Sequence, residues 1–285
     1  MKIARFWKLT KMQVRRPDGK PIDVSTWGWS ADDPSEAQQR SEESSRRLAE
    51  RVSSGQPFPD KYISYGDRPA REEILSETAD ETGNMIAMVT RNRYGAVVLN
   101  TSDLMFIDID VPPDRPPGLL DAIKGLFGSR KPDNFTETLD HILQTARTMS
   151  QYTFRLYRTH AGFRCAVINK RIKPGSAECE DLFAAFRSDP LYVRLCKNQE
   201  SFRARLTPKP WRCDQEAPYF SFPFPNEDIE EIYRKWEREY AVAAEQYATC
   251  TFLEQIGDDR VIADFRQLLD MHDRETKASV SLPLA

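Results

Sequence analysis

The chain contains few of the residues from which metal centres and disulfide frameworks are built. It has five cysteines and three histidines among 285 residues. The cysteines are odd in number and scattered, they form no Cys-x-x-Cys pair, and the histidines lie far from one another. A structural zinc site or a disulfide framework is therefore not expected. The cysteines are interpreted as the reduced thiols of a cytoplasmic protein.

Long apolar runs are also missing. No stretch approaches the roughly 20 apolar residues that span a bilayer, and the segment from Met1 to Lys8 has no apolar run typical of a signal peptide. No membrane association is expected. The formal net charge of −3 is small, so overall charge does not indicate a polyanionic partner. With 40% hydrophobic and 30% charged residues, the composition is typical of a globular chain.

The N-terminal residues have the pattern of a β-hairpin followed by a helix. Residues 3–14 and 22–29 are rich in aromatic and branched side chains, and a Pro-Asp-Gly turn separates them. Residues 32–36 then combine a capping residue, an early proline and acids, which is a helix start. The helix is expected to run to about Val52.

The remaining chain alternates short apolar runs with helical patterns. The runs predict strands at 85–90, 94–100, 104–111, 152–159, 163–168 and 202–206. The helical patterns predict helices at 71–79, 135–150, 176–186, 191–197, 227–247 and 259–272. Residues 118–131 have the pattern of an amphipathic excursion with a basic end, and the residues after 272 that of a frayed tail.

These elements predict an α+β protein rather than a doubly wound fold. We expect a central, mostly antiparallel sheet with flanking helices. The sheet should contain residues 97–100, 104–110, 153–159 and 163–168, with helix 135–150 packed on it. Three units are expected. They are a hairpin–helix unit of residues 1–55, an α+β core of residues 56–225, and a C-terminal helical segment of residues 226–285 packed on the core.

A pair of carboxylates ends the most apolar of the expected strands. Leu, Met, Phe and Ile in succession at 104–107 indicate burial on both faces, and Asp108 and Asp110 follow. Residues two apart on a strand point to the same face. Two carboxylates at that spacing can share Mg²⁺ or Mn²⁺, which can in turn hold phosphate oxygens. The alternative is that both acids only solvate the end of a strand.

Basic residues gather in two blocks near the middle of the chain. Residues 155–175 contain six Lys or Arg and no acid, and residues 194–212 contain six more against one Glu. Arg203 and Arg205 should share a strand face, and Arg158 is expected to share one with Arg164 beyond the turn. Guanidinium groups suit bidentate capture of phosphate. The alternative is an internal network of ion pairs between these arginines and the many acids.

Three short motifs in this region resemble those of the archaeo-eukaryotic primase superfamily. The segment 106–110 is similar to the family's hydrophobic strand ending in Asp-x-Asp. The segment 159–164 is similar to its Ser-Gly-x-Gly-x-His turn, and the segment 205–209 to its Arg-Leu-Pro-Gly-like motif. The resemblance covers about residues 97–214. It departs from the family at Arg164, which stands where the family places its histidine, with His160 four residues earlier.

The resemblance implies a primase-like core that binds a nucleotide or single-stranded nucleic acid and has lost some catalytic features. Asp108 and Asp110 would be the catalytic, metal-binding pair, with Asp214 the candidate third ligand. The phosphate-binding or nucleic-acid-binding residues would be Arg158, His160, Arg164, Arg203, Arg205 and Lys209.

Two other functions remain open at this point. The same acids could serve a different metal-dependent phosphoryl or glycosyl transferase, or a nuclease. The chain could also be a non-enzymatic interaction protein, with exposed aromatic residues and the acidic C-terminal helices as partner surfaces.

Overall fold

The computed structural model describes residues 1–57, 70–112 and 133–285. It is an α+β structure with antiparallel sheets and six helices in the described residues, as the sequence predicts. The strands are β1 (Phe6–Arg15), β2 (Pro21–Ser30), β3 (Glu73–Ala79), β4 (Met85–Arg91), β5 (Val97–Thr101), β6 (Phe106–Asp110), β7 (Phe154–Thr159), β8 (Gly162–Val167), β9 (Phe202–Arg205) and β10 (Cys250–Ile256). The helices are α1 (Pro34–Ser53), α3 (Asn134–Thr148), α4 (Ala177–Ala185), α5 (Pro190–Gln199), α6 (Glu227–Ala244) and α7 (Ala263–Thr276), and a 3₁₀ turn, η1, spans Pro210–Arg212.

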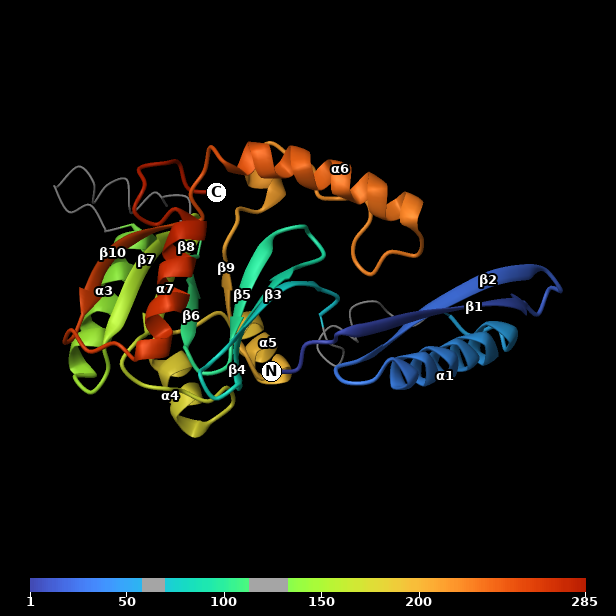
Figure 1. Cartoon of the computed structure of the whole chain (residues 1–285), viewed down its shortest axis with the longest axis horizontal. Helices are drawn as coiled ribbons and strands as arrows, with labels where there is room; N and C mark the ends of the chain where they lie inside the picture. Colours follow the sequence, from blue (N-terminus) through green and yellow to red (C-terminus); the bar gives the residue numbers. More distant parts are fainter. Residues whose placement is uncertain (58–69, 113–132) are drawn as a thin grey trace, which may run out of the picture.

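Two four-stranded sheets form the body of the protein (Figure 1). One has the strand order β10-β7-β8-β6 and the other β3-β4-β5-β9, and every paired neighbour is antiparallel. The sheets meet where β6 and β9 approach each other, so each contributes one edge strand to the junction. The position of this junction matters because β6 carries the carboxylate pair.

The sheet that contains β6 is covered on both faces. One face carries Phe106 and Tyr157, whose rings both contact the imidazole of His272 on α7. The other face carries Phe163, whose ring meets Phe135 of α3 with 6.0 Å between centroids. Because side chains alternate along a strand, residues 108 and 110 lie on the α7 side with Phe106. Burying an aromatic side chain such as Phe106 stabilises the fold by about 2 kcal/mol.

One hydroxyl group bridges the two sheets at their junction. Tyr192 of α5 places its hydroxyl 2.9 Å from the carbonyl oxygen of Phe106 on β6 and 3.0 Å from that of Arg203 on β9. The same oxygen accepts the Arg203 backbone N–H at 3.2 Å. At the junction, backbone groups of the edge strands β6 and β9 thus form hydrogen bonds with a side chain instead of with each other in a ladder.

The hairpin β1–β2 and α1 form a unit at one end of the molecule (Figure 1), with a small core of their own. Val14, Val24 and Val52 are buried together there. A Cβ atom at Gly28 would lie 2.1 Å from the backbone oxygen of Ala37, so only glycine allows the helix to approach the strand this closely. The predicted hairpin and helix are both confirmed.

Several predicted elements differ from the structure. The helix predicted at 71–79 is wrong, because residues 73–79 form β3 and pair with β4. Residues 97–101 belong to the second sheet, where β5 pairs with β4 and β9, and not to the sheet of β6. The residues after 272 are not frayed. Ala285 is fully buried, and its N–H donates to the carbonyl oxygen of Ala248 at 3.0 Å.

The strand β10, which pairs with β7 at the edge of the sheet, was not predicted. Its register shifts between Phe252 and Glu254, which disrupts the two-residue alternation by which strands are recognised. With α7, this strand places residues after 225 in the main core. The predicted excursion at 118–131 lies outside the described residues.

Candidate functional site

Asp108 and Asp110 lie at the end of β6, beside the junction of the two sheets. Opposite Asp110 stands Gly162 of β8, where a Cβ atom would lie 2.0 Å from the carbonyl oxygen of Ile109. The other edge of β6 is held by the N-terminus of α5. The Asp108 carbonyl accepts hydrogen bonds from the Ser188 hydroxyl at 2.8 Å and from the Asp189 N–H at 3.0 Å. The backbone of the carboxylate pair is therefore fixed from both sides.

Arg164 of β8 connects the carboxylate pair to the second sheet. Its side chain is almost fully buried, and its Nε lies 3.5 Å from Oδ1 of Asp108. Its Nη1 donates to the carbonyl oxygen of Arg205, the last residue of β9, at 3.1 Å. The guanidinium group of Arg164 on β8 thus contacts both β6 and β9.

A histidine–carboxylate pair on α7 supports Arg164 from the core. Nη1 of Arg164 lies 3.2 Å from Nε2 of His272. Because a guanidinium group can only donate, Nε2 must accept, and the ring proton sits on Nδ1. Nδ1 donates to Asp273 at 2.9 Å, and Asp273 also accepts from the Tyr157 hydroxyl at 2.8 Å. Burial lowers the pKa of His272 to about 4, so the imidazole is neutral at pH 7.

Three more cations approach the carboxylate pair from β9 and the segment after it: Arg205, Lys209 and Arg212. The segment is held in place by its backbone. Tyr240 of α6 donates to the carbonyl oxygen of Pro208 at 2.6 Å, and the Thr249 hydroxyl donates to that of Leu206 at 2.9 Å. Lys209 and Arg212 therefore project from a fixed turn and not from a loose loop.

The positive charge of Arg205 lies in an energetically unfavourable environment. Burial and the neighbouring Arg164 lower the pKa of its guanidinium to about 10. Among the described residues, its buried Nε finds no hydrogen-bond acceptor. Its guanidinium forms no ion pair with a described carboxylate, although Asp108 is close enough to attract its charge. Burial also lowers the pKa of Lys209, and so does repulsion from Arg205 and Arg212. The charges of these side chains repel one another more than the nearby acids can compensate.

The Asp110 carboxylate lies close to other negative charges. Burial raises the pKa of Asp110, and repulsion from Asp108 and from Asp189 raises it further. Lys209 and Arg205 attract its charge and partly offset this rise. Acids of like charge and cations of like charge thus lie side by side, an arrangement that perturbs pKa values and is common at functional sites.

Arg203 and Arg158 do not join this cluster. Arg203 forms an ion pair with the buried Glu72 at 2.6 Å and donates to Asn100 at 2.8 Å. Arg158 stacks on Phe135, with its guanidinium carbon 3.5 Å from the ring centroid.

The prediction that Arg158 and Arg164 share a face is wrong. Arg158 pairs with Phe163, one position before Arg164, so the two arginines point to opposite sides of the sheet.

Two other predicted site residues make local contacts. Nδ1 of His160 lies 2.8 Å from the carbonyl oxygen of Leu284, so the imidazole contacts the C-terminal segment. Asp214 accepts a long hydrogen bond of 3.4 Å from the Tyr247 hydroxyl. Neither side chain is among the groups that perturb Asp110.

No group of three or more His, Cys, Asp or Glu side chains within the described residues is arranged to hold a metal ion. Asp108 and Asp110 alone supply too few ligands for a cation held only by protein. Mg²⁺, however, is commonly bound by one or two carboxylates together with water and substrate phosphates. The pair therefore fits a metal ion that arrives with a phosphate ligand.

Three residues at the site were not among the predicted site residues. Asp189 was recognised only as the cap of α5, although it also faces Asp110. Arg212 was counted in the basic block, and its spacing of three from Lys209 across a 3₁₀ turn could have indicated its role. Trp211 lies between them, half exposed, with its ring 5.7 Å from the Lys209 amine.

Comparison with models of known protein families, with curated proteins and with solved structures found no match to this chain. The similarity to primases therefore rests on the three short motifs. None of the helices in residues 1–57, 70–112 and 133–285 is long and apolar enough to cross a membrane.

Proposed function

We propose that the protein binds the phosphate groups of a nucleotide at the junction of its two sheets. The observation that carries the proposal is Arg205, a partly exposed arginine beside Arg164. Its Nε is buried without a hydrogen-bond acceptor, and its guanidinium forms no ion pair among the described residues. A buried charge without a partner is costly, and such groups are retained where a ligand supplies the counter-charge. Phosphate oxygens match the geometry of a guanidinium group.

Asp108 and Asp110 would hold Mg²⁺ or Mn²⁺ against the same phosphates. A divalent cation offsets the repulsion that raises the pKa of Asp110, while the phosphates offset the repulsion among Arg205, Lys209 and Arg212. The metal ion of a metal–nucleotide complex would thus reduce the repulsion between the acids, and its phosphates the repulsion between the basic side chains. The exposed ring of Trp211 offers a surface on which a base can stack.

The reaction that best fits these groups is nucleotidyl transfer of the primase type. The metal would neutralise charge that develops on the phosphates, and the arginines would stabilise it from the opposite side. The departures from the primase motifs at Arg164 and His160 allow a second form of the proposal, in which the nucleotide is bound without being polymerised.

An interaction protein without a ligand at this position is the second candidate function. The pairing of Arg203 with Glu72 and the stacking of Arg158 on Phe135 favour it, because half of the predicted arginine centre serves the fold. The two candidates differ in what they predict for Arg205.

Thermal unfolding in the presence of nucleoside triphosphate and Mn²⁺ tests the proposal. A ligand that binds only the folded state stabilises it by about 2.7 kcal/mol at 100 times its Kd. We expect the wild type to show such a shift, and both Arg205→Met and the double variant Asp108→Asn, Asp110→Asn to lose it. Arg266→Met, an exposed position on α7, is the control and should keep the full shift. Equal shifts in all four proteins would exclude the site.

A further inference from the structure

The β1–β2 hairpin carries an excess of positive charge that the rest of the chain does not share. Residues 1–30 contain seven Lys or Arg and two Asp, a net charge of +5, whereas the whole chain has −3. The other residues together therefore carry −8. Lys2 and Arg5 form ion pairs with Glu200 and Glu77. Lys8, Lys11, Arg15, Arg16 and Lys20 form none with any residue that the structure describes.

Aromatic side chains lie on the hairpin among these cations. The helix α1 covers the face that carries Val14, Val24 and Gly28. The odd-numbered residues of both strands lie on the opposite face of the hairpin. On β1 these include Trp7, Lys11 and Arg15. On β2 they include Trp27 and Trp29, and Trp29 is paired with Trp7 across the strands, although Arg40 of α1 contacts the ring of Trp29 at the edge of β2.

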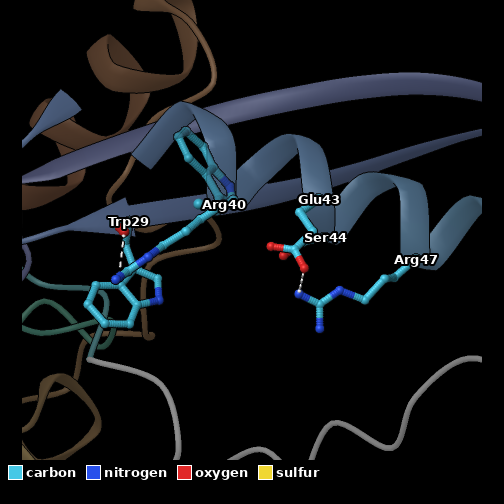
Figure 2. Close-up of a pocket in the computed structure, with 7 residues that line it drawn as sticks. Trp29, Arg40, Glu43, Ser44 and Arg47 are labelled. Atoms are coloured by element: carbon cyan, nitrogen blue, oxygen red, sulfur yellow. Dashed lines mark hydrogen bonds and ion pairs between the residues drawn. The ribbon is translucent and has the colours of Figure 1, made fainter. Parts of the chain in front are cut away.

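Two adjoining depressions share the indole of Trp27. The first, of about 290 Å³, lies along β2 and α1, where the Arg40 guanidinium stacks 4.3 Å from the centroid of Trp29 (Figure 2). Glu43 in this depression is paired with Arg47 on the next turn of the helix. The positive charge of Arg40 is shared with Glu36, so this end of the surface is close to neutral.

The second depression, of about 370 Å³, is the more aromatic of the two, and its cations Arg5, Lys8 and Arg234 are accompanied by Glu73 and Glu230. Trp7 and Trp27 line it on the hairpin side together with Lys8, and Phe222 and Phe224 line it from the segment before α6. All four of these rings are only partly exposed, so they offer firm surfaces instead of freely rotating ones. Lys11 and Arg15 continue the same face toward the tip of the hairpin.

We propose that this face of the hairpin binds single-stranded nucleic acid, with bases stacked on the tryptophans and phosphates on the lysines and arginines. Stacking on aromatic side chains within a positively charged groove is how proteins bind single strands without reading their sequence. A ten-residue strand extends about 33 Å, which is long enough for several nucleotides. The charge decides against an apolar peptide as the occupant, since Lys8, Lys11 and Arg15, which form no ion pair with any described residue, would gain nothing from it.

The proposal does not depend on the nucleotide site at the sheet junction, and the experiment separates the two. Binding of a fluorescein-labelled oligo-dT of about 20 nucleotides is measured by anisotropy with EDTA present, which removes any metal-bridged contact. We expect binding at about 50 mM salt that weakens at least ~10-fold at about 200 mM, because phosphate contacts release counterions. Quenching of tryptophan fluorescence by the unlabelled oligonucleotide should accompany binding.

Two variants with the same change in net charge decide where the strand binds. Lys11→Glu with Arg15→Glu removes two cations from the hairpin face and should weaken binding at least ~10-fold. Arg147→Glu with Arg266→Glu changes the charge equally on α3 and α7, at the other end of the molecule (Figure 1), and should leave the Kd within about twofold.

Substitutions of Trp27 test whether bases stack on the tryptophans. Trp27→Phe keeps an aromatic ring and should keep most of the affinity, while Trp27→Ala should weaken binding roughly tenfold. An equal loss in both charge variants, no binding by the wild type, or preferential binding of a proline-rich peptide would each overturn the proposal. Arg205→Met should bind the oligonucleotide normally, so failure of the nucleotide site would leave this result intact.

Discussion

Arg203 and Arg205 stand two positions apart on one strand, yet their surroundings differ completely. Arg203 is paired with Glu72, whose side chain is 5% exposed, and the pair is surrounded by further hydrogen bonds. Arg205 lies among other cations. The sequence predicts equal roles for the two, because alternation along a strand indicates a shared face but does not identify the partners that reach it from elsewhere.

The two arginines should therefore respond oppositely to substitution. Arg203→Met leaves Glu72 buried without its partner and should cost about 3–5 kcal/mol of unfolding free energy. Arg205→Met removes a partly buried cation that forms no ion pair with a described residue, and it should leave stability unchanged or raise it. Chemical denaturation of the two variants measures both effects. A large loss in Arg205→Met would assign that residue to the fold, in keeping with an interaction protein.

His272 should make the stability of the protein depend on pH in a predictable direction. Its pKa is about 4 in the folded protein, below the ordinary value of 6.5, because it is buried against Arg164 and close to Arg155, with only partial compensation by Asp273. Between these two pKa values, His272 therefore binds a proton in the unfolded chain but not in the folded chain. Stability is fully present above about pH 6.5 and is lost as the pH falls toward 4, by roughly 3 kcal/mol.

Replacing this histidine by glutamine isolates its effect. The variant His272→Gln keeps a hydrogen-bond acceptor for Arg164 but cannot titrate. Its unfolding free energy, measured between about pH 6.5 and 4, should fall less steeply than that of the wild type. Parallel curves would show that the carboxylates of the protein account for its acid sensitivity.

At the scale of elements, the site depends on how closely β6 and β8 pair. Gly162 faces Asp110 across the two strands, and no side chain fits there. Gly162→Ala should push the strands apart and cost about 1–3 kcal/mol. It should also abolish the nucleotide-induced rise in melting temperature, because Asp110 and Arg164 would move relative to each other.

A glycine elsewhere provides the comparison for this variant. Gly83 has a positive φ of 85° in the turn between β3 and β4, but open space around it. Gly83→Ala should lose stability through backbone strain, of order 1–2 kcal/mol, and still respond fully to the nucleotide. A similar loss of response in both would mean that general destabilisation, and not the strand pairing, is responsible.

Elements with strong local signals were predictable, and those decided by distant partners were not. The cap and proline at the start of α1, and the apolar run of β6, specify their structures locally. The segment 73–79 has helix-forming residues, but pairing with β4 overrides that preference. β10 has a bulge and three successive exposed residues, 253–255, so its pattern is too weak to detect without knowing that β7 offers an edge.

At the scale of the whole molecule, the sequence predicted the pair Asp108 and Asp110, with Arg164 and Arg205 near it. It could not predict that the acids lie on one sheet and most of the cations on the other. That division arises from the pairing of β9 with β5, which joins residues over a hundred positions apart. The contact of His272 with Arg164 could not be predicted either, because His272 belongs to a helix far along the chain.

The bridge made by the Tyr192 hydroxyl has a kinetic consequence. The two sheets are joined at the site by this hydroxyl and by the reach of Arg164 to β9, without a continuous ladder. A nucleotide held by Asp108 on one side and Lys209 on the other would span the joint, and it could leave only when the sheets part slightly. The ligand would then enter and leave only as often as the joint opens, and Tyr192→Phe, which removes the bridge, would speed both association and dissociation.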